Sequence, residues 1–61
     1  MPIIYLKSGG YCECEGYTIK DNCIKAVGVK FNVDNLPEEL KKQKEAVIPL
    51  DNVLYIVSPK S

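Results

Sequence analysis

The sequence predicts a small, mainly β fold with a minor helical part (small α+β). We expect a five-stranded antiparallel sheet that is bent or closed into a barrel, with one short helix between the third and fourth strands. Runs of β-branched and aromatic residues are separated by turn signals at 8–10, 21–22 and 51–52. The chain leaves this pattern once, in the polar segment 32–45. Because it has 61 residues, we expect one domain over 1–61.

The first two strands are predicted at residues 3–7 and 11–20, joined by a Ser-Gly-Gly turn. In the second strand Cys12 and Cys14 alternate with Glu residues, which is typical of a strand with one buried face. Gly16 predicts a bulge or bend within this strand.

The third strand is predicted at residues 23–31. It follows the dipeptide Asp21-Asn22, which predicts a tight hairpin turn because Asn tolerates positive φ. Neither face of the third strand is cleanly polar, so we expect a curved strand that is partly covered on both sides.

The polar segment 32–45 predicts the helix. Leu36 and Leu40 stand four residues apart and would rest on the sheet. Asn35 and Glu38 resemble a capping box, and acidic residues precede lysines as the helix dipole prefers.

The last two strands are predicted at residues 46–50 and 53–57. The final one is apolar on both faces, and a chain of this size has only one core. Domains this small bury only about 60% of their unfolded surface and usually need a further source of stability. We therefore predict a homo-oligomer whose interface contains the residues of this strand, Val53, Leu54, Tyr55, Ile56 and Val57.

The composition argues against an enzyme. Eight lysines balance eight acidic residues, and the chain has no Arg, His or Trp. Without His, the commonest general acid or base near neutral pH is missing. Without Arg and without net positive charge, binding of long nucleic acids through bulk charge is not supported.

Cys12, Cys14 and Cys23 could in principle hold a metal. Their spacing differs from the paired ligands of structural zinc sites, and no His completes a set. The odd number of cysteines also argues against a disulfide framework. We expect buried free thiols, no metal and no cofactor, with a metal shared between subunits as the alternative.

Aromatic residues alternate with lysines along the predicted strands in a way that could stack bases and screen phosphates. The competing interpretation is that aromatics favour strands and lysines prevent aggregation of sheet edges. Under the first interpretation, a nucleotide or short RNA would contact Tyr17, Lys20 and Lys25.

The order of strands and turns resembles the Sm-like family of small β-barrels, including its Hfq branch. The resemblance rests on Leu6, Gly9 or Gly10, Gly16 and the Asp21-Asn22 turn. It implies a strongly bent five-stranded barrel that assembles into rings. It also implies base binding at the two Asp-Asn turns, through Asp21, Asn22, Asp51 and Asn52.

We therefore predict a non-enzymatic, oligomeric binding module whose partner is a protein, or a nucleotide or short oligonucleotide held where turns of adjacent subunits meet. The alternative is an inhibitory or structural protein that blocks a larger partner through a strand edge, or sequesters a small ligand. Lysine without arginine suggests an A+T-rich genome, and a phage origin would favour this alternative. No signal segment or long apolar run is evident, so we expect a cytoplasmic protein without a membrane partner.

Overall fold

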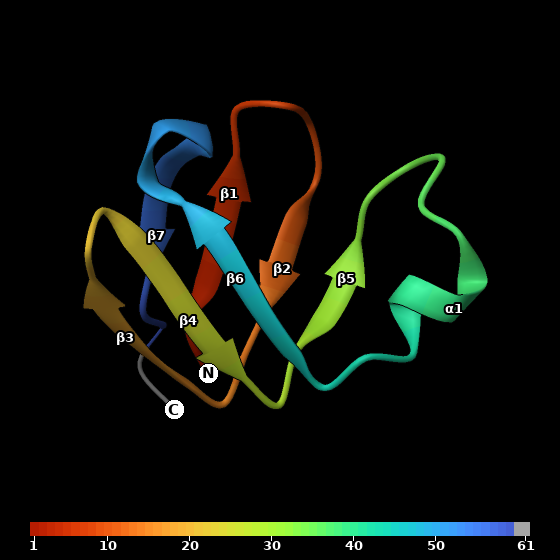
Figure 1. Cartoon of the computed structure of the whole chain (residues 1–61), viewed down its shortest axis with the longest axis horizontal. Coiled ribbons are helices and arrows are strands. Elements are labelled where there is room, and N and C mark those ends of the chain that lie inside the picture. The colour runs from red at the N-terminus through yellow and green to blue at the C-terminus, as the bar shows by residue number, and fades with distance from the viewer. Residues whose placement is uncertain (60–61) are drawn as a thin grey trace.

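Two antiparallel sheets lie against each other in the computed structural model, which describes residues 1–59 (Figure 1). One sheet has four strands in the order β5-β2-β1-β7, and the other has three in the order β3-β4-β6. The strands are β1 (Ile3–Leu6), β2 (Tyr11–Glu13), β3 (Gly16–Lys20), β4 (Cys23–Val27), β5 (Lys30–Asn32), β6 (Glu45–Pro49) and β7 (Val53–Val57). The helix α1 (Glu38–Lys41) follows β5, and the 3-10 helix η1 (Leu50–Asn52) joins β6 to β7.

The prediction of five strands was wrong, because two of the predicted strands each divide into two. The predicted strand 11–20 divides into β2 and β3, and the predicted strand 23–31 divides into β4 and β5. Within each pair the two halves belong to different sheets. A strand that leaves one sheet and enters another must bend, and the bend predicted near Gly16 is present between β2 and β3.

The predicted closed barrel is also wrong. Within the described residues β6 pairs with β4 and β7 pairs with β1, but β6 and β7 do not pair with each other. These two strands follow each other in the chain, yet η1 directs them into different sheets (Figure 1). The result is an open two-sheet arrangement with free strand edges.

The core lies between the two sheets. Ile4, Cys12 and Cys14 are fully buried on the side of the four-stranded sheet, and Ile24 and Ala26 are fully buried on the side of the other. The remaining buried residues are Leu6, Val29 and Ile48. The predicted burial of Cys12 and Cys14 is therefore confirmed.

The helix is shorter than predicted. It begins after Pro37, which makes no side-chain cap hydrogen bond, so the predicted capping box does not form. Asn35 instead adopts a φ of 64° and turns the chain before the helix. Leu36 is half-buried but Leu40 is 49% exposed, so the predicted packing of Leu40 on the sheet is wrong. A helix of four residues is too short to turn both leucines toward the core.

Gly28 makes the bend between β4 and β5, with a φ of 63°. A Cβ atom at this position would collide with the side chain of Glu15. We expect Gly28→Ala to lower the free energy of unfolding by at least about 1–2 kcal/mol, the cost of left-handed backbone for an L residue.

Gly16→Ala is the matched control for this prediction. Gly16 lies at the other bend, its φ is outside the left-handed region, and an added Cβ meets no atom within 4 Å. Urea denaturation followed by circular dichroism should separate the two variants. Equal destabilisation by both would contradict the role assigned to Gly28.

Candidate functional site

The turns that the sequence suggested for ligand binding meet at one end of the molecule. Asp21 and Asn22 have φ values of 53° and 60° and form the predicted tight turn between β3 and β4. The backbone N–H of Leu50 donates to the carbonyl of Asn22 at 2.9 Å, so η1 lies against this turn. The N–H of Lys7 donates to the carbonyl of Asn52 at 2.8 Å, which brings the β1–β2 loop to the same end (Figure 1).

The side chain of Asn52 connects η1 to the β1–β2 loop. Its Oδ1 accepts a hydrogen bond from the N–H of Ser8 at 3.0 Å, and its Nδ2 donates to the Ser8 hydroxyl at 3.1 Å. Both polar atoms of this amide therefore already have partners inside the protein. Asp21, Asn22 and Asp51 are exposed at the same end.

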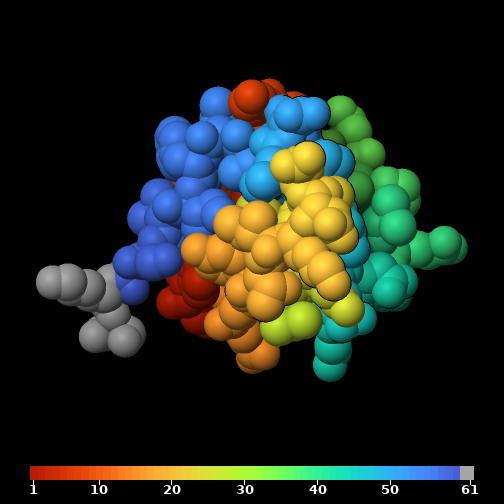
Figure 2. Space-filling model, turned by 60° about the vertical axis from the view of Figure 1, so that its left-hand side comes forward, coloured from red at the N-terminus to blue at the C-terminus, as the bar shows by residue number. Residues whose placement is uncertain are grey.

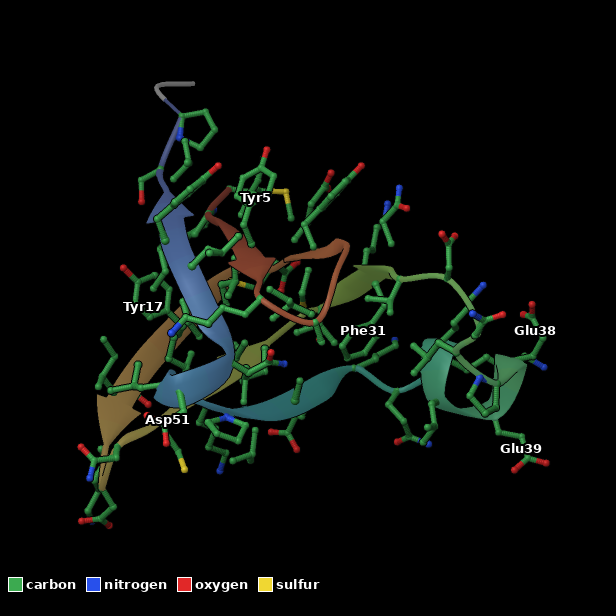
Figure 3. The ribbon with its side chains drawn as sticks, turned by 90° about the horizontal axis from the view of Figure 1, so that it is seen from above. Tyr5, Tyr17, Phe31, Glu38, Glu39 and Asp51 are labelled. Carbon is green, nitrogen blue, oxygen red and sulfur yellow. The ribbon has the colours of Figure 1, made fainter. Side chains whose placement is uncertain are left out.

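The other predicted ligand contacts do not form one group. Lys20 ends β3 beside the turn and is exposed. Lys25 lies in the middle of β4 opposite Thr18 and Val47, on the face of the three-stranded sheet that points away from the core. Tyr17 lies opposite the buried Ala26, so it is on the core-facing side of the edge strand β3, where it is 36% exposed. Figure 3 shows Tyr17 and Asp51 as separate side chains.

The charges at the loop end are mixed. The acidic residues Asp21 and Asp51 accompany Lys20, and the loop that docks beside them contains Lys7. Two carboxylates oppose the approach of a phosphate group, so this end favours contacts to a base or a peptide over contacts to phosphate. Within residues 1–59 no enclosed pocket forms, and no three His, Cys, Asp or Glu side chains gather in a metal-binding arrangement.

The thiols of Cys12 and Cys14 are held in their neutral form. Burial, with smaller contributions from Cys14 and Glu13, raises the pKa of Cys12 from near 9 to about 11. Burial also raises the pKa of Cys14. Cys23 is half-buried, and all three cysteines are free. Because the thiolate is the reactive form, Cys12 and Cys14 are poor nucleophiles at neutral pH.

The raised pKa of Cys12 predicts a loss of stability at alkaline pH. In the unfolded chain this thiol titrates near pH 9, whereas in the folded protein it titrates near pH 11. Between these values the folded state holds more protons than the unfolded state, so the free energy of unfolding should fall as pH rises. Below about pH 9 the contribution is fully present.

Urea denaturation at several pH values measures this effect, and Cys12→Ala is the comparison. The variant should show a shallower fall in stability between about pH 9 and about pH 11. A residual slope is expected, since the pKa of Cys14 is also raised. Identical slopes for the variant and the parent protein would exclude Cys12 as the source.

Three tyrosines form a row on the outer face of the four-stranded sheet. Tyr11, Tyr5 and Tyr55 lie opposite one another in β2, β1 and β7. The ring centroid of Tyr5 lies 5.6 Å from that of Tyr11 and 5.1 Å from that of Tyr55, and in both pairs the two ring planes are tilted relative to each other. Asn32 Nδ2 donates to the Tyr11 hydroxyl at 2.9 Å. In Figure 3, Tyr5 points away from the second sheet, whereas Phe31 points between the sheets.

This tyrosine row was not predicted from the sequence. The sequence treats these tyrosines only as strand aromatics that alternate with lysines. Their spacing within each strand could have placed each one on the face opposite the buried residues. Only the sheet order β2-β1-β7 makes the three residues neighbours.

The predicted interface strand β7 is an edge strand in which some residues pack against the core and the others are exposed. Ile56 lies opposite the buried Ile4, and both Ile56 and Val53 pack against the core. Leu54, Tyr55 and Val57 are 55%, 57% and 41% exposed. Figure 2 shows β7, in blue, on the surface beside β3, in orange to gold.

The four edge strands differ in how they discourage pairing with other chains. Natural sheets limit such pairing with lysines, prolines, charged residues, β-bulges or very short edge strands. The strand β5 has three residues and begins with Lys30, β3 ends with Lys20, and β6 contains Glu45 and Pro49. The strand β7 contains no charged residue and no proline. Its one feature of this kind is the bulge against β1 that leaves Leu54 unpaired.

Comparison of the chain with protein-family models, with curated proteins and with solved structures finds no match. In the described part of the chain, no helix has the length and apolar character needed to cross a membrane.

Proposed function

We propose that this chain is a non-enzymatic binding module that self-associates through the edge of β7. The observation that supports this proposal is the absence of charge and proline from β7, together with the exposure of Leu54, Tyr55 and Val57. An exposed apolar edge is a template for pairing with a further strand. Main-chain hydrogen bonds supply affinity in such pairing, and the exposed side chains supply selectivity.

Association would also compensate for the small core. Eight buried residues form the centre of the described structure, and two of these are cysteines and one is an alanine. Domains of this size are marginally stable, and a partner that binds only the folded form stabilises it by mass action. Burying the exposed part of β7 adds apolar area that the single chain leaves in water.

The end of the molecule formed by Asp21, Asn22 and Asp51 is the proposed ligand surface of the module. Its support is the convergence of three loops and the exposure of these side chains. The resemblance to the Sm-like family is compatible with a strongly bent sheet and favours a nucleotide or short RNA as ligand. The mixed charge favours a protein segment. Both belong to the proposal, and the experiment below tests the nucleotide.

Two measurements on the purified protein test the proposal. Sedimentation equilibrium across micromolar concentrations should give a mass above the 6.8 kDa of one chain. A panel of nucleotides and short oligoribonucleotides, with binding followed by tyrosine fluorescence, tests the ligand surface. Binding that is lost in Asn22→Ala but kept in Lys25→Ala would support the loop end as the site. Binding equally lost in both variants, or in neither, would contradict it.

An inhibitory or structural role is the second candidate, and the same edge supports it. If β7 pairs with a sheet of a different protein instead of a second copy, the purified chain should be monomeric at all concentrations. That result would exclude self-association. The second candidate would then be that β7 adds a strand to the sheet of a different protein.

A further inference from the structure

We propose that the tyrosine row formed by Tyr11, Tyr5 and Tyr55 is a docking surface for a proline-rich segment of a partner protein. The occupant is a peptide in the polyproline II conformation that lies along the row, across the strands. This inference does not rest on the proposed function. Pairing at the β7 edge uses main-chain groups, so it would leave the outer face of the sheet open.

The outer face of the four-stranded sheet is uncovered and carries no net charge. In the described part of the chain the helix α1 lies beyond β5 and not over this face, and Tyr5 points away from the second sheet (Figure 3). The register places one acidic and one basic residue on this face, Glu13 opposite Lys30. Its other members are the three tyrosines, Ile3, Asn32 and Val57. Exposed apolar surface of this kind, rimmed by polar residues, marks a site of interaction.

The balance of charge on this face indicates the kind of partner. Proteins that hold single-stranded nucleic acids on aromatic side chains do so in a positively charged groove. Here the one lysine of the face lies opposite a carboxylate, and the whole chain has no Arg and no net charge. Tyrosine is enriched in protein interfaces, because its ring buries a large apolar area and its hydroxyl forms a hydrogen bond. An uncharged peptide therefore suits this face better than a phosphate polymer.

The spacing of the row fits a polyproline II helix. The ring centroids are 5.6 and 5.1 Å apart along the row, and the rings of each pair are inclined by 46° and 47°, so the row is ridged and not flat. Neighbouring strands lie about 4.8 Å apart, which puts Tyr11 and Tyr55, two strands apart, at roughly 10 Å from each other. A polyproline II helix advances about 9.3 Å in one turn of three residues. Prolines at positions i and i+3 would therefore fall over Tyr11 and Tyr55.

The hydrogen-bonding groups of the face and the peptide are also complementary. A polyproline II segment has no internal hydrogen bonds and proline has no N–H, so the ligand presents carbonyl acceptors. The row presents hydroxyl donors. The Tyr11 hydroxyl accepts a hydrogen bond from Asn32 Nδ2 at 2.9 Å, which holds the hydroxyl in place and leaves its own hydrogen to donate to a ligand.

Binding of an oligoproline tests this inference. A fluorescein-labelled oligoproline of about ten residues, long enough to span the row, is titrated with the protein and followed by fluorescence anisotropy. Tyr55→Leu should weaken binding by at least about tenfold, because it removes a 57% exposed ring and its hydroxyl but keeps an apolar side chain. Tyr17→Leu is the matched control. It makes the same change on the other sheet, opposite Ala26, and should bind within about twofold of the parent protein.

A second titration uses the parent protein and depends on no variant. A Gly-Ser peptide of the same length and label is a flexible coil and does not present a preformed helix. It should bind at least about tenfold more weakly than the oligoproline, since it lacks the rings that pack on the row and loses more conformational freedom. Equal binding of the two peptides would overturn the inference.

The remaining outcomes are equally decisive. Saturable oligoproline binding that is weakened in Tyr55→Leu and kept in Tyr17→Leu supports the tyrosine row as the site. Absence of binding at about 1 mM, or equal effects of the two substitutions in variants that circular dichroism shows to be folded, overturns it. Binding of an oligouridylate that is lost in Tyr55→Leu, without binding of the oligoproline, overturns it in favour of base stacking. A monomeric parent protein would contradict the proposed self-association and leave this inference intact.

Discussion

Replacing Ile24 by Ala is expected to lower the free energy of unfolding by about 2–5 kcal/mol, the range for truncating a buried aliphatic side chain. Ile24 is fully buried in β4, the central strand of its sheet. It lies opposite Ile19 on one side and Ile48 on the other, so its truncation removes contacts across the whole sheet. A domain of 61 residues has a total stability of roughly 3–9 kcal/mol. A large part of the protein should therefore be unfolded at room temperature.

Val47→Ala is the control for Ile24. Val47 belongs to the neighbouring strand β6, but it is 67% exposed and points away from the core. Its truncation should change stability by no more than about 0.5 kcal/mol. Urea denaturation followed by circular dichroism, at one fixed protein concentration, compares the two. If both variants lose the same stability, the core is not where the structure places it.

Replacing Val57 by Lys is expected to weaken self-association by about tenfold or more, which corresponds to roughly 1.4 kcal/mol. Val57 is 41% exposed at the end of β7, opposite Ile3. A lysine there puts a hydrated charge on an edge that otherwise has none, and lysines on edge strands discourage pairing. The variant should stay folded, because Val57 is not part of the buried core.

Sedimentation equilibrium measures this change, and Leu40→Lys is the matched control. Leu40 is 49% exposed on α1, so it loses a similar apolar surface and gains the same charge far along the chain from β7. The control should associate as the parent protein does. If both substitutions weaken self-association equally, the effect comes from the change in net charge, and β7 is not part of the interface. Ile56→Asp is a poorer test, since Ile56 packs on the core and its replacement would unfold the chain.

Several features could be predicted from local sequence alone. The Asp21-Asn22 turn forms as predicted because Asn and Asp are among the few residues that accept left-handed backbone. The alternation of Cys12 and Cys14 with Glu residues correctly predicted two buried thiols, because side chains of a strand alternate between its faces. The polar composition of residues 32–45 located the helix but not its length, because four-residue helices depend on contacts that local propensity does not encode.

The candidate sites show the limits of the same approach. The two Asp-Asn turns were predicted to bind ligand where turns of adjacent subunits meet. In the single chain both turns lie at the same end. The side-chain amide of Asn52, however, already uses both its polar atoms in hydrogen bonds to Ser8. Tyr17 and Lys25 were grouped with the turn at Asp21-Asn22, although Tyr17 stands four residues before it and Lys25 three residues after it in extended strands, well away from the turn.

The apolar character of β7, the absence of Arg and His, and the positions of the turns were determined by the sequence by itself, because each depends on residue type or on neighbours in the chain. The tertiary structure decided which strands have free edges, which residues of β7 remain exposed, and that three tyrosines form one row. Those features depend on pairing between segments up to 54 residues apart, such as β1 with β7, where Ile3 lies opposite Val57. Periodicity within a strand defines its two faces, but only the sheet order determines what lies beside it.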